Sequence, residues 1–282
     1  MRVDPRELFQ GTIVIVAPHM DDEVLACGGT IAHLPQKEQI HVIYATDGMK
    51  SPAPIVPWQD AISPDLGEVR VQESRAAMQF LGVPGENTHF LRLPEAELSK
   101  HVPALRRGLL DLIGRLKPAH ILIPFRYDRH PDHLAINHII TAAHKQHLYQ
   151  GHLTEYFVYY RWRLLPGRDV RQYIQPKYLL EVDTQEVSTR KRTALDCFKS
   201  QTTKFYPWQT RPILTSILLD EVSQTPELFL RYDASAPGAA VFSRAVPWIR
   251  IAHRLEPFLQ RWKYQIGAFL RRGVQKNDSQ AT

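Results

Sequence analysis

The sequence predicts an α/β protein, with a Rossmann-like three-layer sandwich around a mostly parallel sheet and a smaller C-terminal α/β and helical portion. Short apolar runs alternate with amphipathic stretches from residue 12 onward, which is typical of βαβ units. Two clusters of histidine and aspartate come directly after two of these apolar runs. Ligands of open α/β sheets bind outside the carboxyl ends of the strands, so we expect both clusters at one crevice.

The first half of the chain contains strands and helices in alternation. Strands are expected at residues 12–17, 40–46, 88–93 and 120–125, and helices at residues 23–34, 68–82 and 100–116. Asp21 or Asp22 opens the first helix, because the positive N-terminus of a helix stabilises a carboxylate. Gly82 closes the second helix in the left-handed conformation that glycine adopts readily. Ser99 is expected to cap the third helix, and Pro118 ends it.

The second half continues with a helix over residues 129–148, where apolar side chains recur at helical spacing. Two strands are expected at residues 155–160 and 177–183, and Asp183 is expected to cap a helix over residues 184–201. Residues 51–64 contain four prolines and no periodicity, which predicts a loop. This loop serves either as a lid or wall of a site or as an irregular connection.

Composition limits the class of protein. With 282 residues and 44% apolar content, the chain can bury a sizeable core, and we expect residues 1–205 to form the main domain and residues 206–282 an extension that completes it. The N-terminus lacks the apolar core of a signal peptide, and Cys27 and Cys197 have no disulfide-framework spacing, so a cytoplasmic location is expected. The net charge of +6 is dispersed rather than gathered in a patch, and nucleic acid is not an expected partner.

The two clusters read "HMDDE" at residues 19–23 and "RHPDH" at residues 129–133. Taken singly, the first is a favourable start for a helix and the second a proline turn. Taken together at the strand ends of one sheet, their carboxylates would repel one another without a cation. Imidazole nitrogens and carboxylate oxygens are donors that zinc and ferrous iron accept, so the sequence predicts a catalytic metal site with three protein ligands and an open position.

These motifs carry a resemblance to a known family. The segments "PHMDDE" and "HPDH", together with "GGTIA", "ATDG", "VRVQESRAAMQFLGV" and "ALDCFKSQ", resemble the LmbE-like or PIG-L family of zinc-dependent N-acetylglucosaminyl deacetylases over residues 11 to 205. Met20 departs from the pattern, because the family usually has proline at this position. The resemblance implies a catalytic domain that removes acetyl groups from N-acetylglucosamine conjugates and uses Zn²⁺, with Fe²⁺ as the alternative metal in the cell.

The resemblance also implies roles for individual residues. The metal ligands that it implies are His19, Asp22 and His133. Asp21 is then the general base that deprotonates water. His130 stabilises the oxyanion or protonates the departing amine, and Asp132 orients His130.

Four further residues are candidates for contact with the substrate. Arg70 and Glu73 resemble a family pair near the sugar, although an ion pair one helical turn apart explains them equally well. Asp47 either binds sugar hydroxyls or caps a turn, and Asp128 either contacts the substrate or supports a metal ligand. Cys27 is expected to be a buried packing residue.

The C-terminal tail over residues 245–273 combines aromatic and aliphatic residues at helical spacing with many Arg and Lys residues. It is expected either to pack on the core or a second subunit of a homo-oligomer, or to attach to an anionic membrane surface. The overall expectation is an N-deacetylase acting on an N-acetylated amino-sugar conjugate. The alternatives are a metallophosphoesterase, which would hold two metals with a bridging carboxylate, and a non-catalytic sugar-binding protein.

Overall fold

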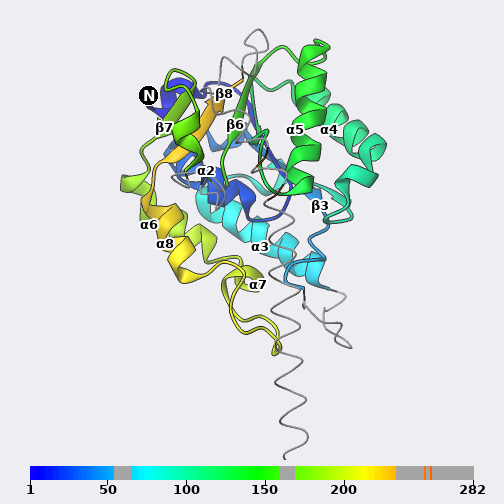
Figure 1. The fold of residues 1–282 in the computed structure, drawn as a ribbon, viewed down its shortest axis with the longest axis vertical. Helices are drawn as coiled ribbons and strands as arrows, with labels where there is room; N and C mark the ends of the chain where they lie inside the picture. Colours follow the sequence, from blue (N-terminus) through cyan, green and yellow to red (C-terminus); the bar gives the residue numbers. More distant parts are fainter. Residues whose placement is uncertain (54–64, 159, 161–168, 233–250, 252–254, 256–282) are drawn as a thin grey trace, which may run out of the picture.

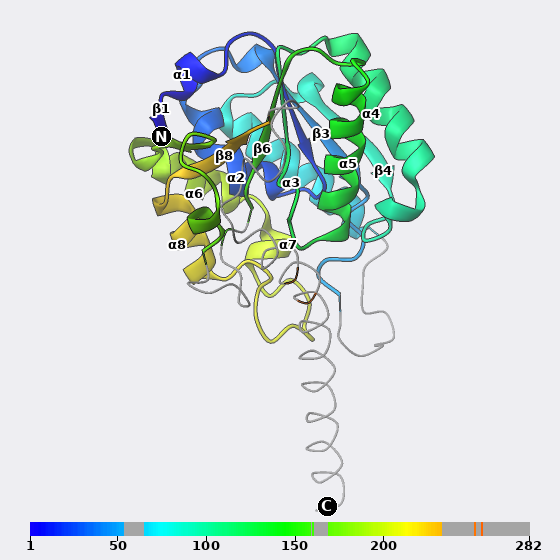
Figure 2. The ribbon, with the colours of Figure 1, turned by 45° about the horizontal axis from the view of Figure 1, so that its top comes forward.

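The computed structural model describes residues 1–53, 65–158, 160, 169–232, 251 and 255. Within these residues the strands form an eight-stranded sheet in the order β1-β7-β8-β6-β5-β2-β3-β4, with helices on both faces (Figures 1 and 2). The strands are β1 Arg2–Val3, β2 Ile13–Ala17, β3 Ile40–Thr46, β4 Thr88–Leu93, β5 His120–Pro124, β6 His152–Tyr156, β7 Leu179–Val182 and β8 Glu227–Arg231. The helices are α1 Pro5–Leu8, α2 Asp22–His33, α3 Leu66–Leu81, α4 Val102–Leu116, α5 Pro131–Lys145, α6 Ser188–Leu195, α7 Lys199–Thr202 and α8 Ser216–Gln224.

The strand directions confirm the expected fold class. β2 lies parallel to β3 and β5, β4 is parallel to β3, and β6 is parallel to β5. β8 is antiparallel to both β6 and β7, between which it lies. The sheet is therefore mostly parallel, and a strand from the last third of the chain is inserted into it.

Apolar side chains pack on both faces of the central strands, which is why β2 is a continuous apolar run. One core layer contains Val14 and Val16 and is covered by α4 and α5, and the other contains Ile15 and is covered by α2, α3 and α6 (Figure 2). On α4, Leu105 and Leu109 are fully buried. Each such leucine contributes roughly 1.5–3 kcal/mol relative to an exposed one.

Several expected boundaries differ in the structure. The third long helix begins at Val102 after a short 3₁₀ turn, so Ser99 does not cap it. The expected helix over residues 184–201 is divided into a 3₁₀ turn, α6 and α7, and the Asp183 carboxylate accepts the backbone N–H of Gln185 instead of capping one continuous helix. The strand expected at residues 155–160 lies earlier, at β6. The prediction for Gly82 is confirmed, because it ends α3 with a φ of 90°.

Two regions of interest lie partly outside the described residues. They are the proline-rich loop beyond residue 53 and the tail over residues 245–273, of which Ile251 and Leu255 alone are described. The attachment of the tail stays a prediction. In the part of the chain that the structure describes, no helix has the length and apolar character needed to cross a bilayer.

Candidate metal centre

The two polar clusters meet because β2 and β5 are adjacent and parallel. Residues 19–23 follow the carboxyl end of β2, and residues 128–133 follow that of β5. The helices α2 and α5 begin directly after these two strand ends, so their N-termini lie at the same edge of the sheet (Figure 1). Each cluster therefore starts a helix, and the two clusters also meet at one edge of the sheet.

Three donor atoms of the clusters form a small triangle. Asp22 Oδ2 lies 3.0 Å from His19 Nδ1 and 3.2 Å from His133 Nε2, and the two ring nitrogens are 3.4 Å apart. Tetrahedral zinc with ligands at about 2.0–2.1 Å requires its donor atoms to be about 3.3 Å apart. The triangle therefore fits the three ligands that the resemblance implies. All three side chains are buried.

His130 lies beside this triangle. Its ring centroid is 4.5 Å from that of His19 and 5.2 Å from that of His133, and each of the three histidines offers a nitrogen within 4.8 Å of the others. His130 is the N-cap of α5, and its Nδ1 accepts the backbone N–H of Asp132 at 3.2 Å. Burial, together with the charges of His19 and His133, lowers the pKa of His130 to about 3. The ring is therefore neutral, and its proton resides on Nε2, where it can be donated.

The Asp132 carboxylate lies closer to His19 than to His130, the histidine that it was expected to orient. Its Oδ2 lies 3.3 Å from Nε2 of His19, whereas 3.9 Å separates it from Nδ1 of His130. The carboxylate also accepts backbone N–H groups from Ala96 at 2.6 Å and Leu98 at 3.0 Å. Burial raises the pKa of Asp132, but the hydrogen bond with His19, the charges of His19 and His130 and the hydrogen bond from Leu98 together keep the pKa below its usual value. Asp132 thus touches His130 through its backbone and His19 through its side chain.

Asp128 lies beside His133, the second histidine of the triangle. Its Oδ2 lies 3.2 Å from Nδ1 of His133, outside strict hydrogen-bond alignment, and its Oδ1 accepts the backbone N–H of His130 at 2.9 Å. Carboxylates placed behind metal-binding histidines fix the ring orientation and raise the basicity of the ligand. Asp128 is buried behind His133, so of the two roles considered for it the structure favours support of a ligand.

Asp21 is held in an unusual backbone conformation. Its φ of 151° lies in the region that L-residues rarely adopt, at a cost of about 1–3 kcal/mol, and its carboxylate makes no cap for α2. Burial and the neighbouring Asp22 raise the pKa of Asp21, Arg70 opposes the rise, and the resulting value is about 7. A carboxylate that titrates near neutral pH is suited to accept a proton from water.

Arg70 lies beneath the site and is only 1% exposed. Its Nη2 donates to the carbonyl of Met20 at 2.9 Å and lies 3.7 Å from Asp21 Oδ2, while its Nη1 lies 3.7 Å from Glu95 Oε2. No ion pair with Glu73 is recorded among the described residues. Arg70 therefore supports Asp21 and the turn at Met20 from below.

The other substrate candidates also have structural partners. Glu73 accepts the backbone N–H of Ser200 at 2.7 Å and its hydroxyl at 2.6 Å, which anchors α7 on α3. Asp47 Oδ1 accepts the backbone N–H groups of Met49 and Glu95, both at 3.1 Å. These contacts organise the loops around the site, and contact of Glu73 or Asp47 with a substrate stays a prediction.

Glu95 is a residue that the sequence reasoning missed. It is buried, lies near Arg70, and its Oε2 accepts the backbone N–H of Lys50 at 2.7 Å. A signal was present, because Glu95 follows the end of β4 as Asp47 follows the end of β3. Its negative charge contributes to the raised pKa values of both Asp21 and His19.

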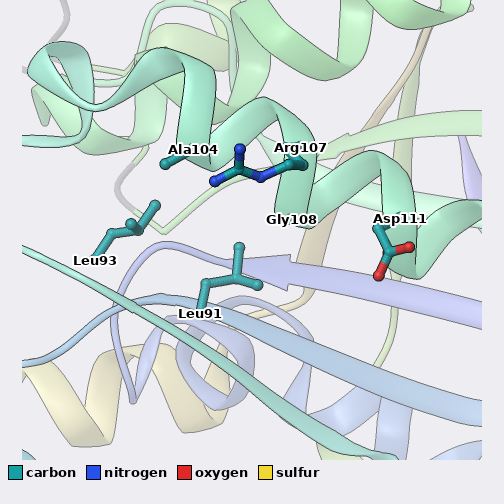
Figure 3. A pocket seen from close by; sticks show the side chains of 6 residues that line it. All are labelled: Leu91, Leu93, Ala104, Arg107, Gly108 and Asp111. Atoms are coloured by element: carbon teal, nitrogen blue, oxygen red, sulfur yellow. The ribbon is translucent and has the colours of Figure 1, made fainter.

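Two hollows among the described residues lie away from this centre. A cavity of about 430 Å³ lies between β4 and α4 (Figure 3). Its lining is formed by Leu91, Leu93, Ala104, Arg107, Gly108 and Asp111. None of these residues belongs to the metal cluster.

The comparisons with known proteins agree with this geometry. A family model described as PIG-L, GlcNAc-PI de-N-acetylase, matches residues 14–144. The 1D-myo-inositol 2-acetamido-2-deoxy-alpha-D-glucopyranoside deacetylase of Mycolicibacterium smegmatis is 30% identical over 165 residues, which are 49% of this chain and 53% of that protein. The chain spans about half the length of the curated relatives that it matches first.

Solved structures show the same fold at low identity. A conserved protein of Thermus thermophilus, TT1542, superimposes with a TM-score of 0.57 at 21% identity, over 81% of this chain and 100% of that one. The 4-carboxy-2-hydroxymuconate hydratase GalB of Pseudomonas putida has a TM-score of 0.51 at 19% identity, over 68% of this chain and 80% of that one. A hydratase on this fold means that the fold alone does not decide the reaction. The match covers residues 14–144, which contain both motifs of the metal centre, so this part of the chain is similar to the PIG-L family.

Proposed function

We propose that the protein is a metal-dependent deacetylase that hydrolyses the acetamide of an N-acetylglucosamine-containing conjugate to a free amine and acetate. The observation that carries this proposal is the triangle of His19, Asp22 and His133 donors at tetrahedral spacing, with Asp21 and His130 beside it. The substrate class is supported by the matched family model and by the deacetylase of M. smegmatis.

Zinc is the proposed metal, and ferrous iron is the alternative, because two imidazoles and one carboxylate suit both. Such an ion, when bound, would lower the pKa of a bound water toward neutrality and polarise the acetamide carbonyl. Asp128 and Asp132 hold the two imidazoles in the orientation that this site requires.

Asp21 is proposed as the general base. Its pKa of about 7 allows the carboxylate to accept a proton from the attacking water and, once protonated, to return that proton to the departing amine nitrogen. The reaction balances, because the oxygen of water becomes part of the acetic acid. One hydrogen of the water passes through Asp21 to the amine, and the other stays with the acetic acid. Arg70 holds the Asp21 carboxylate in place from the buried side.

His130 is proposed to stabilise the negative charge that develops on the carbonyl oxygen. The bond from the backbone N–H of Asp132 occupies Nδ1, so the neutral ring presents an Nε2–H donor. Donors placed in advance for a developing oxyanion contribute about 2.7–4 kcal/mol to catalysis. Of the two roles considered for His130, this geometry favours the oxyanion donor over the acid.

The metallophosphoesterase alternative would require a second metal and a bridging carboxylate. Among the described residues, the triangle of His19, Asp22 and His133 offers three donor atoms, which is the number that one catalytic zinc takes from a protein. A sugar-binding protein without activity has no need of a base with a pKa near 7 beside its metal.

The test is acetate release from N-acetylglucosamine conjugates by zinc-loaded protein, compared with chelated protein and with Asp21→Asn. We expect activity to disappear on chelation and to fall by about 10²- to 10⁴-fold in Asp21→Asn. Asp111→Asn is the matched control, because Asp111 is an exposed carboxylate on α4 that pairs with Arg115. Acetate release that survives both chelation and Asp21→Asn would refute the proposal.

A further inference from the structure

We propose that residues 199–219, called here the rim segment, form a docking surface for an anionic lipid bilayer beside the metal centre. The rim segment comprises α7, the loop that follows it and the start of α8. Its binding is independent of the deacetylase chemistry, so the proposal stands or falls separately from the proposed function.

Hydrogen bonds connect the rim segment to the floor of the metal centre. Gln201 Nε2 donates to the carbonyl of Ser51 at 2.9 Å, and Arg70 Nη1 donates to the same carbonyl at 3.4 Å. Arg70 in turn holds Met20 and Asp21. Figure 2 shows the loop after α7 extending away from the body of the sheet. A membrane that contacted this loop would therefore lie next to the metal centre.

The loop of the rim segment has a defined fold. The backbone N–H of Leu214 donates to the carbonyl of Gln201 at 2.9 Å, which ties the two ends of the loop together. Inside it, Gln209 accepts the backbone N–H of Tyr206 at 2.8 Å and donates its own to the Tyr206 carbonyl at 3.0 Å. The Tyr206 and Trp208 rings are stacked at 5.4 Å. The loop thus presents a fixed surface.

That surface combines apolar and basic side chains. Ile217 is 78% exposed and Ile213 is 43% exposed, although both are large apolar residues. Lys204 and Arg211 are exposed on the same segment, and Asp220, the first acid after it on α8, is paired with Arg192. Aliphatic, aromatic and basic residues without acids are the composition of protein segments that bind the interface of anionic membranes.

The charge distribution favours a bilayer over a second copy of the chain. In a symmetric dimer through this surface, Lys204 and Arg211 would face like charges, and the neighbouring acid, Asp220, is already paired with Arg192. The C-terminal tail adds to the same argument, because it is rich in Arg and Lys, and Ile251 and Leu255 are 47% and 51% exposed. An anionic lipid surface satisfies both the basic and the apolar side chains.

The test is flotation of the full-length zinc-loaded protein with vesicles of phosphatidylcholine alone or with added phosphatidylglycerol. We expect binding to the anionic vesicles only. The double variant Ile213→Ser/Ile217→Ser should weaken binding by about tenfold or more, because each isoleucine loses its burial in the acyl chains. Lys204→Gln/Arg211→Gln should weaken vesicle binding more at low salt than at high salt, because salt screens the attraction between the basic side chains and the anionic lipid.

The matched control is Phe80→Ser/Val102→Ser, which removes two similarly exposed apolar side chains from α3 and α4. This variant should bind vesicles as the unchanged protein does. Zinc stoichiometry and acetate release from a water-soluble substrate, measured in parallel, should remain unchanged in all variants and thereby exclude misfolding. No binding to either vesicle, equal loss in the control, or full binding by Ile213→Ser/Ile217→Ser would overturn the proposal. A dimer that the same substitution dissociates would also overturn it.

Discussion

Replacement of Asp132 by Asn tests whether this carboxylate acts on the metal centre through His19. The carboxylate lies at His19 Nε2 and accepts two backbone N–H groups, from Ala96 and Leu98. When His19 binds a metal through Nδ1, its Nε2 carries a proton that Asp132 accepts. Both oxygens of the Asp132 carboxylate face N–H donors. Asparagine has an NH₂ group in place of one of these oxygens, so this group would face an N–H group and neither could accept a hydrogen bond from the other.

The size of the effect follows from these contacts. Loss of a carboxylate behind a ligating histidine lowers metal affinity by about 10- to 100-fold. That range corresponds to about 1.4–2.8 kcal/mol of binding free energy. The unmatched N–H group should also lower the stability of the metal-free protein, by about 1–3 kcal/mol.

Zinc affinity is measured by competition with a chromophoric chelator, and stability by denaturant unfolding of the metal-free protein. Asp111→Asn, at an exposed position of α4, is the control and should leave both quantities unchanged. If Asp132→Asn lowered stability but bound zinc as tightly as the unchanged protein, the role of Asp132 in orienting His19 would be refuted.

Three other predictions follow from the structure. Because the pKa of Asp21 is raised to about 7, the base is protonated below that pH, so kcat/KM should fall as the pH decreases through about 7, and a flat profile down to pH of about 5 would contradict this role. Lys191→Met removes the 2.7 Å cationic partner of the buried Glu227 carboxylate, which keeps only the backbone N–H groups of Gly29 and Thr30, and should lower the free energy of unfolding by about 3–5 kcal/mol. A loss below about 1 kcal/mol in denaturant unfolding would show that the two N–H groups suffice to stabilise the carboxylate. Gly48 has a φ of 69°, and Gly48→Ala would place a Cβ atom 2.5 Å from Met20 Cε, so this substitution should lower stability by about 1–3 kcal/mol. In a double-mutant cycle, Gly48→Ala should cost less stability when Met20→Ala has already removed the contact.

The sequence by itself determined the order of most elements and the chemistry of the site. Apolar periodicity is a local property, so the central strands and the helices that cover them are found close to their expected positions. The two motifs also contain the proposed donors, because His19, Asp22 and His133 follow strands whose carboxyl ends meet in a parallel sheet.

Tertiary structure alone decided which side chain each of these residues contacts. Asp132 lies two residues after His130 and directly before His133. Its carboxylate nevertheless contacts His19, which follows a different strand. Likewise, Arg70 turns under Asp21 rather than toward Glu73, and β8 enters the sheet between β6 and β7. These contacts join residues far apart in the chain and depend on backbone angles such as the φ of Asp21, which no local pattern encodes.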